Sequence, residues 1–390
     1  MSDWPRGSPS PEEIRDWCQS LRLIPSREAL EESPFWRQWG AAVTKLLRMP
    51  HAAPAAAPAA GPTAAPGAGP PPSRSGGRSV RIVHWNILKG IAFERVLEAL
   101  ASHPHLAGAD VILLNEVDVG MARSRNRHVA AELARQLGLY WVFQPNYLEL
   151  TKGPGADDEA PGENETGLHG VAVLTRVRPL AWSGIPLPES FDMFPFGEKR
   201  LGQRIGLVLA LPGGLVTGTA HHEVRGSALG RAVQMQAFLG GADAFCRRVR
   251  AQGKVAEQVL LSGDLNTHTF SRGSLCRTAA GALRLLLTPR GRLREQFDEP
   301  WRAGREPLFA VMEEAGYQWA HLNASGATAH APLALIEEGD GLAAPLRRLL
   351  QRCLPFRERG IPLHLGWFFG RGLPNAPVAT WIVSDLAGSF

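Results

Sequence analysis

Cysteine is scarce in this 390-residue chain, and the cysteines present form no pattern. Cys18, Cys246, Cys276 and Cys353 lie far apart, without a Cys-x-x-Cys pair and without a histidine at zinc-finger spacing. Neither a disulfide framework nor a structural zinc site is therefore indicated.

Long apolar runs are also missing. No segment approaches the roughly 20 apolar residues that cross a bilayer. The first four residues are followed by charged residues rather than by the basic and apolar stretches of a secretory signal. On these grounds we expect a cytoplasmic protein without a transmembrane segment.

Lysine is rare among the charged residues. Lysine and arginine together number 42 against 37 acidic residues, the net charge is +5, and nearly all of the positive charge is arginine. A basic balance suits an anionic substrate, such as a phosphate ester, a nucleic acid or a lipid head group. A compositional bias toward Ala, Gly, Pro and Arg explains the charge equally well, so the charge alone selects no function.

The composition divides the chain into three parts. Residues 1–48 carry apolar positions at helical spacing and are predicted to form two short amphipathic helices. Residues 49–78 are almost wholly Ala, Pro and Gly, which predicts a disordered linker, because such a segment buries too little apolar surface to offset chain entropy. Residues 79–390 have the length of one large domain. The tethered N-terminal helices would suit docking to a protein partner of unknown identity.

The large domain begins as strand, helix, strand. Residues 80–86 alternate in polarity, residues 93–100 suit a helix, and residues 111–114 form a continuous apolar run typical of a buried strand. A crossover of this length favours parallel neighbouring strands, whose carboxyl ends meet at one edge of the sheet. We therefore expect Asn86 to lie near Glu116, where a carboxylate suits a hard cation such as Mg²⁺. Either residue alone is equally typical of a turn.

Two further predicted strands end in polar residues. A strand over residues 215–219 leads to His221, and a buried strand over residues 259–261 leads to Asp264 and Asn266. The last two residues are two positions apart and can project the same way. A single histidine at a strand end is more often structural than catalytic, so the aspartate and asparagine are the sharper signal.

Five short motifs follow one another in a recognisable order. They are WNILKG (residues 85–90), LLNEVD (113–118), LHGVAVLTR (168–176), TAHHE (219–223) and SGDLNTH (262–268). Each is weakly specific, but in this order they resemble the endonuclease/exonuclease/phosphatase superfamily, which includes pancreatic-type deoxyribonucleases, exonuclease III-like apurinic endonucleases, sphingomyelinases and inositol polyphosphate 5-phosphatases. The resemblance implies an α/β (α+β) fold, a four-layer α/β/β/α sandwich of two mixed β-sheets flanked by helices.

The resemblance also implies roles for the residues in these motifs. Glu116 resembles the principal metal ligand, for Mg²⁺ or alternatively Mn²⁺, and Asn86 resembles a residue that supports both metal and phosphate. Asp264 and Asn266 resemble the pair that orients or deprotonates the attacking water and steadies the phosphate. His221 matches the histidine that contacts the developing negative charge.

His169 opens the strand of the third motif and falls where many members place a site residue, with its role left open. The carboxyl end departs from the family pattern. Gly366 stands where members carry an aspartate, and Leu386 stands where Ser-Asp-His would place a histidine. Asp385 either faces the metal as a ligand or matches the pattern by chance. Loss of this acid/base pair would lower the rate by about 10²–10⁴.

Two functions follow from these residues. The first is a metal-dependent hydrolase of phosphoester bonds, as a phosphodiesterase, nuclease or phosphatase, and the five retained motifs favour it. The alternative is a catalytically inactive relative that binds a phosphorylated ligand or a protein. The class of the phosphorylated substrate stays open between nucleic acid, a phospholipid head group and a small phosphoester.

Overall fold

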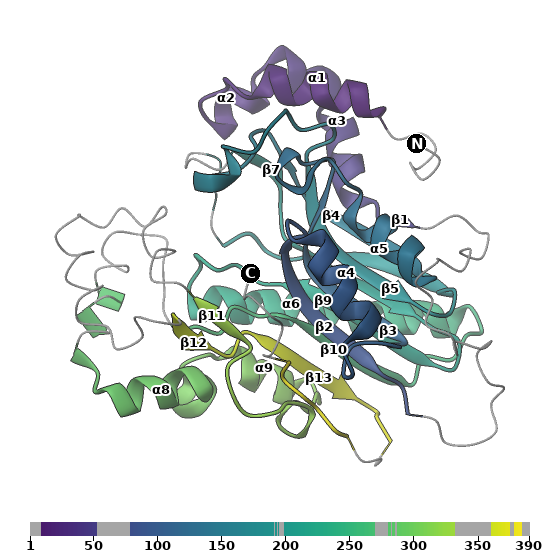
Figure 1. Cartoon of the computed structure of the whole chain (residues 1–390), viewed down its shortest axis with the longest axis vertical. Coiled ribbons are helices and arrows are strands. Elements are labelled where there is room, and N and C mark those ends of the chain that lie inside the picture. Colours follow the sequence, from purple (N-terminus) through teal and green to yellow (C-terminus); the bar gives the residue numbers. More distant parts are fainter. Residues whose placement is uncertain are drawn as a thin grey trace.

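Two β-sheets packed face to face, with helices on their outer sides, make up the fold of the chain (Figure 1). The computed structural model describes residues 9–52, 79–190, 192, 194, 199–269, 280–281, 283–284, 287–331, 360–374 and 378–383. This arrangement confirms the predicted α/β sandwich of two mixed sheets flanked by helices.

The first sheet has the strand order β1-β4-β5-β3-β2, with β7 paired to β4. Its strands are β1 (His51–Ala52), β2 (Ile82–Lys89), β3 (Val111–Val119), β4 (Tyr140–Glu149), β5 (Leu168–Thr175) and β7 (Arg200–Gly202). Strands β2 and β3 are parallel neighbours, as predicted, and the other pairings of this sheet are antiparallel.

The second sheet has the order β13-β10-β9-β8-β6. Its strands are β6 (Ala181–Pro186), β8 (Ile205–Ala210), β9 (Leu215–His221), β10 (Gln258–Asp264) and β13 (Gly366–Arg371). Strands β9 and β10 are parallel, so His221 and Asp264 lie side by side at their carboxyl ends. A small separate hairpin pairs β11 (Ala329–Ala331) with β12 (Ile361–Leu363).

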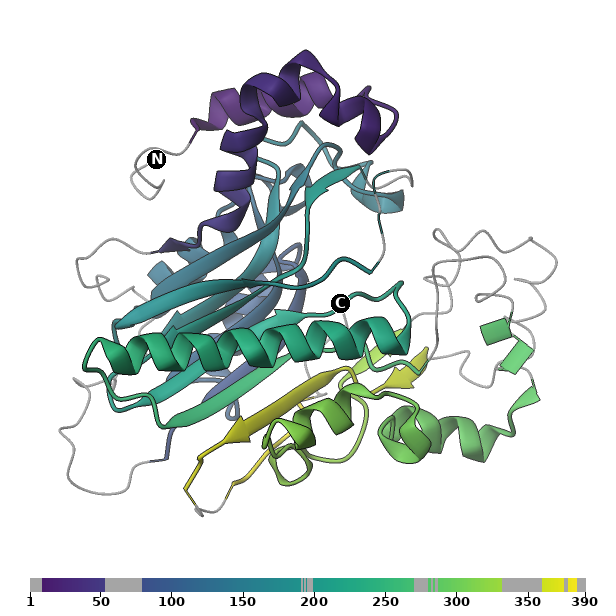
Figure 2. The ribbon, with the colours of Figure 1, turned by 180° about the vertical axis from the view of Figure 1, so that it is seen from behind.

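Helices cover the outer face of each sheet. Over the first sheet lie α3 (Pro34–Arg48), α4 (Phe93–Ser102) and α5 (Val129–Leu137), while the long α6 (Ala228–Ala251) crosses the back of the second sheet (Figure 2). The remaining helical segments are α1 (Pro11–Leu21), α2 (Arg27–Glu31), α8 (Arg290–Asp298), α9 (Leu308–Glu314) and the 3₁₀ turns η1 (Ala122–Ser124), η2 (Gly155–Asp157), η3 (Arg302–Gly304) and η4 (Ala320–Leu322). None of the helices in the described part of the chain combines the length and apolarity that a bilayer crossing requires.

The apolar core lies in three layers. A central cluster between the sheets includes Val111, Leu113, Val171 and Val173 from the first sheet and Leu207 from the second. Two outer clusters bury the other face of each sheet under its helices. Because β3 is buried on both faces, its sequence is apolar at consecutive positions until the polar residues that follow Leu114.

The N-terminal segment forms three helices rather than the two predicted, and they pack against the rest of the chain. Ile14, Leu21 and Val43 are buried in the same cluster as the outer face of the first sheet. Gln144 on β4 donates a hydrogen bond to the carbonyl oxygen of Leu47 (2.8 Å). The start of the predicted linker forms β1 against β4, and residues 53–78 lie outside the described part of the chain.

Candidate active site

One amide and two carboxylates meet where the two sheets face each other. Asn86 Nδ2 donates to Glu116 Oε1 (3.0 Å) and to Asp264 Oδ2 (2.9 Å). His221 Nε2 lies 4.0 Å from the same Asp264 oxygen. The structure therefore brings together Asn86, Glu116, His221 and Asp264, which sit on four different strands of two sheets.

Strained backbone positions aim two of the predicted residues. Glu116 has φ 52° at a point where the pairing register of β3 shifts, and Asn266 has φ 50° just after β10. Left-handed backbone at residues other than glycine costs of the order of 1–3 kcal/mol and is concentrated at functional sites. The bulge turns the Glu116 carboxylate toward Asn86 instead of leaving it in the regular alternation of the strand.

Asn115, which the sequence analysis missed, holds the base of this cluster. Its Oδ1 accepts a hydrogen bond from the backbone N–H of Asp264 (2.8 Å), and its Nδ2 donates to Thr219 Oγ1 (3.0 Å). His84 Nε2 lies 2.8 Å from the same Oδ1, so this nitrogen carries a proton and donates. An amide directly after four consecutive apolar residues of the strand was the available signal.

Asn266 is held mainly by backbone contacts. Its N–H donates to Asp264 Oδ1 (3.1 Å), and its side-chain Nδ2 donates to the carbonyl oxygen of His222 (2.8 Å). The contacts place Asn266 at the mouth of the two parallel strands. The predicted contact of Asn266 with phosphate stays a prediction.

The pKa values of Asp264 and His221 in the cluster are shifted from their ordinary values. Burial raises the pKa of Asp264, and the nearby charge of Glu116 raises it further, although the hydrogen bond from Asn86 offsets part of the shift. Burial lowers the pKa of His221 well below its ordinary value, and the positive charge of Arg204 adds to the effect. At neutral pH His221 is therefore an uncharged imidazole beside two acidic groups.

Two arginines near the cluster were also missed. Arg204, on the connection between β7 and β8, is buried, and its Nε lies 3.5 Å from a carboxylate oxygen of Glu223. The guanidinium of Arg200 lies over the ring of Tyr147, 3.9 Å from the ring centroid. In a chain so rich in arginine, no local pattern singles these two out.

His169 lies on β5 opposite Asp118 of β3. Its Nδ1 is 2.7 Å from Asp118 Oδ1, and Arg123 binds the same carboxylate through two nitrogens, at 2.8 Å and 3.0 Å. Burial alone would raise the pKa of Asp118, but the charge of Arg123 and the hydrogen bonds to this carboxylate outweigh burial and lower the pKa to about 2.

Gly366 lies opposite Asp264 in the β10–β13 pairing. A Cβ atom at this position would lie 3.1 Å from Nδ1 and 3.2 Å from Cε1 of His84, which is tighter than ordinary packing. The imidazole of His84 thus fills the space beside this position, and an aspartate here would displace it. Asp385 and Leu386 lie outside the described residues.

The oxygens of the cluster fit a hard divalent cation. Mg²⁺ is usually bound through one or two carboxylates and several waters, and Glu116 and Asp264 share one amide nitrogen without a cationic side chain bonded to either oxygen pair among the described residues. No group of three or more His, Cys, Asp or Glu side chains poised to hold a metal occurs in the described ranges. The cluster offers such a cation the oxygens of two carboxylates and one amide.

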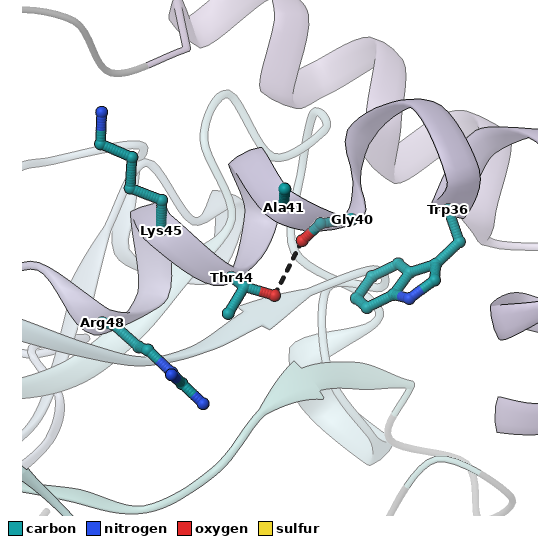
Figure 3. A pocket seen from close by; sticks show the side chains of 6 residues that line it. All are labelled: Trp36, Gly40, Ala41, Thr44, Lys45 and Arg48. Atoms are coloured by element: carbon teal, nitrogen blue, oxygen red, sulfur yellow. Dashed lines mark hydrogen bonds between the residues drawn. The ribbon is translucent and has the colours of Figure 1, made fainter.

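A surface hollow lies away from this cluster, on the N-terminal helices. It encloses about 530 Å³ along α3 and is lined by Trp36, Gly40, Ala41, Thr44, Lys45 and Arg48 (Figure 3). Thr44 Oγ1 there donates to the carbonyl oxygen of Gly40 (2.7 Å), an internal helix contact. The hollow contains none of the predicted site residues.

The sequence matches the model of one known protein family. The model of the "Endonuclease/Exonuclease/phosphatase family" matches residues 83–333, which is more than half of the sequence. The matched segment contains all five motifs and ends before Gly366. No curated protein matches the sequence.

Similar solved structures include three proteins. An endonuclease/exonuclease/phosphatase from Beutenbergia cavernae is 17% identical with a TM-score of 0.40, and the alignment covers 75% of this chain and 64% of that one. A 3′-5′ exonuclease from Neisseria meningitidis is 16% identical, with a TM-score of 0.38 and coverage of 74% and 86%. The catalytic domain of human nocturnin is 12% identical, with a TM-score of 0.36 and coverage of 75% and 82%.

Proposed function

Because the chain belongs to the endonuclease/exonuclease/phosphatase family, we propose that it is a metal-dependent hydrolase of phosphoester bonds. The observation that carries the proposal is the pair of hydrogen bonds from Asn86 to Glu116 and Asp264. These bonds join two acidic residues from opposite sheets at a single point. Two carboxylates that share one amide nitrogen repel each other unless a cation or a reaction makes use of them.

Glu116 and Asn86 would hold Mg²⁺, or alternatively Mn²⁺, and Asp385 is a further proposed ligand. Such an ion, when bound, withdraws negative charge from phosphoryl oxygens. Asp264 orients the attacking water and accepts its proton, a task that its raised pKa favours because the carboxylate is a stronger base. Asn266 steadies the phosphate from the other side of Asp264.

Two further groups act on the negative charge that develops during attack. His221, uncharged at neutral pH, donates one N–H to a phosphoryl oxygen. Arg204 contributes a fixed positive charge from a buried position, where the low dielectric strengthens its effect. Both groups act on the phosphoryl centre itself and leave the rest of the substrate unspecified, whether nucleic acid, phospholipid head group or small phosphoester.

A second candidate function is a phospho-ligand-binding or protein-binding module without turnover. The observation that favours it is Gly366, where a Cβ atom would lie 3.1 Å from the His84 ring, so this ring would have to shift to admit the aspartate of the family pattern. Under this alternative the same cluster binds phosphate and metal but does not complete the reaction.

The deciding experiment is hydrolysis of bis-p-nitrophenyl phosphate and p-nitrophenyl phosphate with Mg²⁺ or Mn²⁺, with and without chelator. We expect metal-dependent release by the wild type and loss of release in Asp264→Ala. Asp243→Asn serves as the matched control, because Asp243 pairs with Arg371 on the outside of the second sheet. Release that persists in Asp264→Ala, or its absence from the wild type, would contradict the proposed enzyme.

A further inference from the structure

Asp118 and His169 stand beside the cluster on the inner face of the first sheet. They are direct partners in the β3–β5 pairing. His169 is two residues before Val171 on β5, and Val171 belongs to the apolar cluster between the sheets, so His169 faces the second sheet as well. Glu116 lies two residues before Asp118 on β3, the strand next to β5. His169 is also close enough to His221 to contribute to the lowered pKa of that histidine, so the pair borders the cluster.

The hydrogen bonds fix which ring nitrogen of His169 is available. Both oxygens of Asp118 are ion-paired with Arg123, so this carboxylate accepts, and Nδ1 of His169 carries the proton of their 2.7 Å bond. Arg123 binds both oxygens of the same carboxylate, and its Nη2 lies 3.5 Å from Nδ1 of His169, so these contacts together hold the ring in one orientation. Within the described ranges no hydrogen bond to Nε2 is formed, and 9% of the His169 side chain is exposed.

The other histidines near the cluster lack this arrangement. Nε2 of His84 is used by Asn115, and both ring nitrogens of His222 are buried without a hydrogen-bond partner in the described part of the chain. His221 lies near Asp264 at 4.0 Å, beyond hydrogen-bond length. Among these histidines, His169 is therefore the one that a carboxylate orients. Asp118 binds Nδ1 of its ring, and Nε2 stays available.

We propose, on the basis of the proposed hydrolase function, that Asp118 and His169 form the acid/base pair of this chain, with Nε2 of His169 donating the proton to the leaving oxygen. The pair takes over the work of the aspartate and histidine that the carboxyl end lacks. Its carboxylate and imidazole come from β3 and β5, so neither position 366 nor position 386 is needed for it.

Two proton transfers accompany the cleavage of the phosphoester bond. Water attacks phosphorus and gives a proton to Asp264, the bond between phosphorus and the leaving oxygen breaks, and that oxygen takes the proton from Nε2. His169 keeps the Nδ1 proton that it donates to Asp118. A proton from solvent restores Nε2–H, and Asp264 releases its proton to solvent, so no other reactant is consumed.

The test compares leaving groups in His169→Gln. A general acid matters most when the leaving oxygen is strongly basic, so kcat for phenyl phosphate or diphenyl phosphate should fall on the order of 10²–10⁴. The fall should be much smaller for the matching p-nitrophenyl ester, and KM should change little for either. The matched control is His128→Asn, which replaces another buried imidazole and preserves the cap of α5, because asparagine is a good N-cap.

NMR detects the Nδ1 proton of His169 directly and does not depend on turnover. In ¹⁵N-labelled protein the wild type should show a hydrogen-bonded Nδ1–H resonance that is absent in His169→Gln and shifted in Asp118→Asn. His169→Gln and His169→Asn keep the Asp118–Arg123 ion pair, so they carry the test even where Asp118→Asn fails to fold.

Two outcomes separate the proposals. A wild type that hydrolyses none of the four esters overturns the proposed hydrolase and, with it, this assignment. A wild type that is active while His169→Gln loses equal rates on phenyl and p-nitrophenyl esters overturns the assignment alone. An Nδ1 resonance unaffected by Asp118→Asn would do so as well.

Discussion

Two acidic residues on one strand, Glu116 and Asp118, meet opposite surroundings. Asp118 is bound by the guanidinium of Arg123 through two hydrogen bonds, and its charge is neutralised inside the protein. Glu116 is bound by an amide, which it shares with Asp264, and these two carboxylates raise the local negative charge together. The difference separates a carboxylate whose charge is matched by a cation inside the protein from two carboxylates that share only an amide.

The two surroundings shift carboxyl pKa values in opposite directions. The pKa of Asp118 is lowered to about 2, whereas burial and the charge of Glu116 raise the pKa of Asp264. A lowered carboxyl pKa stabilises the folded state at neutral pH, and a raised one destabilises it. The same sheet sandwich thus contains a stabilising acid and a destabilising one.

The largest expected effect is on activity at the unneutralised cluster. Asp264→Asn should lower hydrolysis of p-nitrophenyl esters by about 10²–10⁴, because the proton acceptor is lost. Without divalent cations its melting temperature should equal or exceed that of the wild type, since a buried charge is removed. Calorimetry and initial rates measure the two effects. A clear loss of stability in Asp264→Asn would contradict the conclusion that the charge of Asp264, unlike that of Asp118, destabilises the fold.

The next effect is on stability at the neutralised acid. Asp118→Ala should lower the free energy of unfolding by about 3–5 kcal/mol, because it leaves the buried charge of Arg123 without its partner. The double variant Asp118→Leu with Arg123→Met should recover much of that loss. Urea unfolding measures all three proteins. Equal instability of the single and double variants would show that the ion pair is not the source of the effect.

A smaller effect depends on pH. Because the folded-state pKa of Asp118 is lowered to about 2, its ionisation stabilises the fold fully above the ordinary carboxyl pKa, and this part is lost as the pH falls toward 2. The shift corresponds to about 2 kcal/mol. The stability gap between wild type and Asp118→Asn should therefore narrow on acidification, as urea unfolding from pH 7 to pH 3 would record. A gap independent of pH would refute the lowered pKa.

The smallest effect concerns packing beneath the cluster. Gly366→Ala should cost about 1–3 kcal/mol, since the added methyl group presses on the His84 ring. In a His84→Ala background the same change should cost much less, and a double-mutant cycle measures the coupling. Additive costs would mean that the two residues do not compete for this space.

The sequence predicted the parts of the molecule in which local pattern and family motif agree. The parallel β2 and β3 were predicted from the crossover length, and the structure brings Asn86 and Glu116 within hydrogen-bond distance as expected. Asn115 and Arg204 were not foreseen, because each contacts partners far along the chain. Arg123 was not foreseen either, although its partner Asp118 is five residues away. Spacing within a motif does not encode such pairings.

The amino-terminal helices show a related limit. Their amphipathic pattern indicated apolar faces but not what covers them, and a protein partner was one expectation. The structure buries Ile14, Leu21 and Val43 against the first sheet of the same chain. A pattern of apolar positions specifies that a face is buried, and only the assembled sheet specifies where.

This packing has a consequence for synthesis on the ribosome. Helices α1 and α3 are made before β4 and β5, the strands that share their apolar cluster. At about 5–20 residues per second, the roughly 100 residues from the end of α3 to the end of β4 take about 5–20 s to translate. During that interval the apolar faces of the nascent helices have no sheet to pack against.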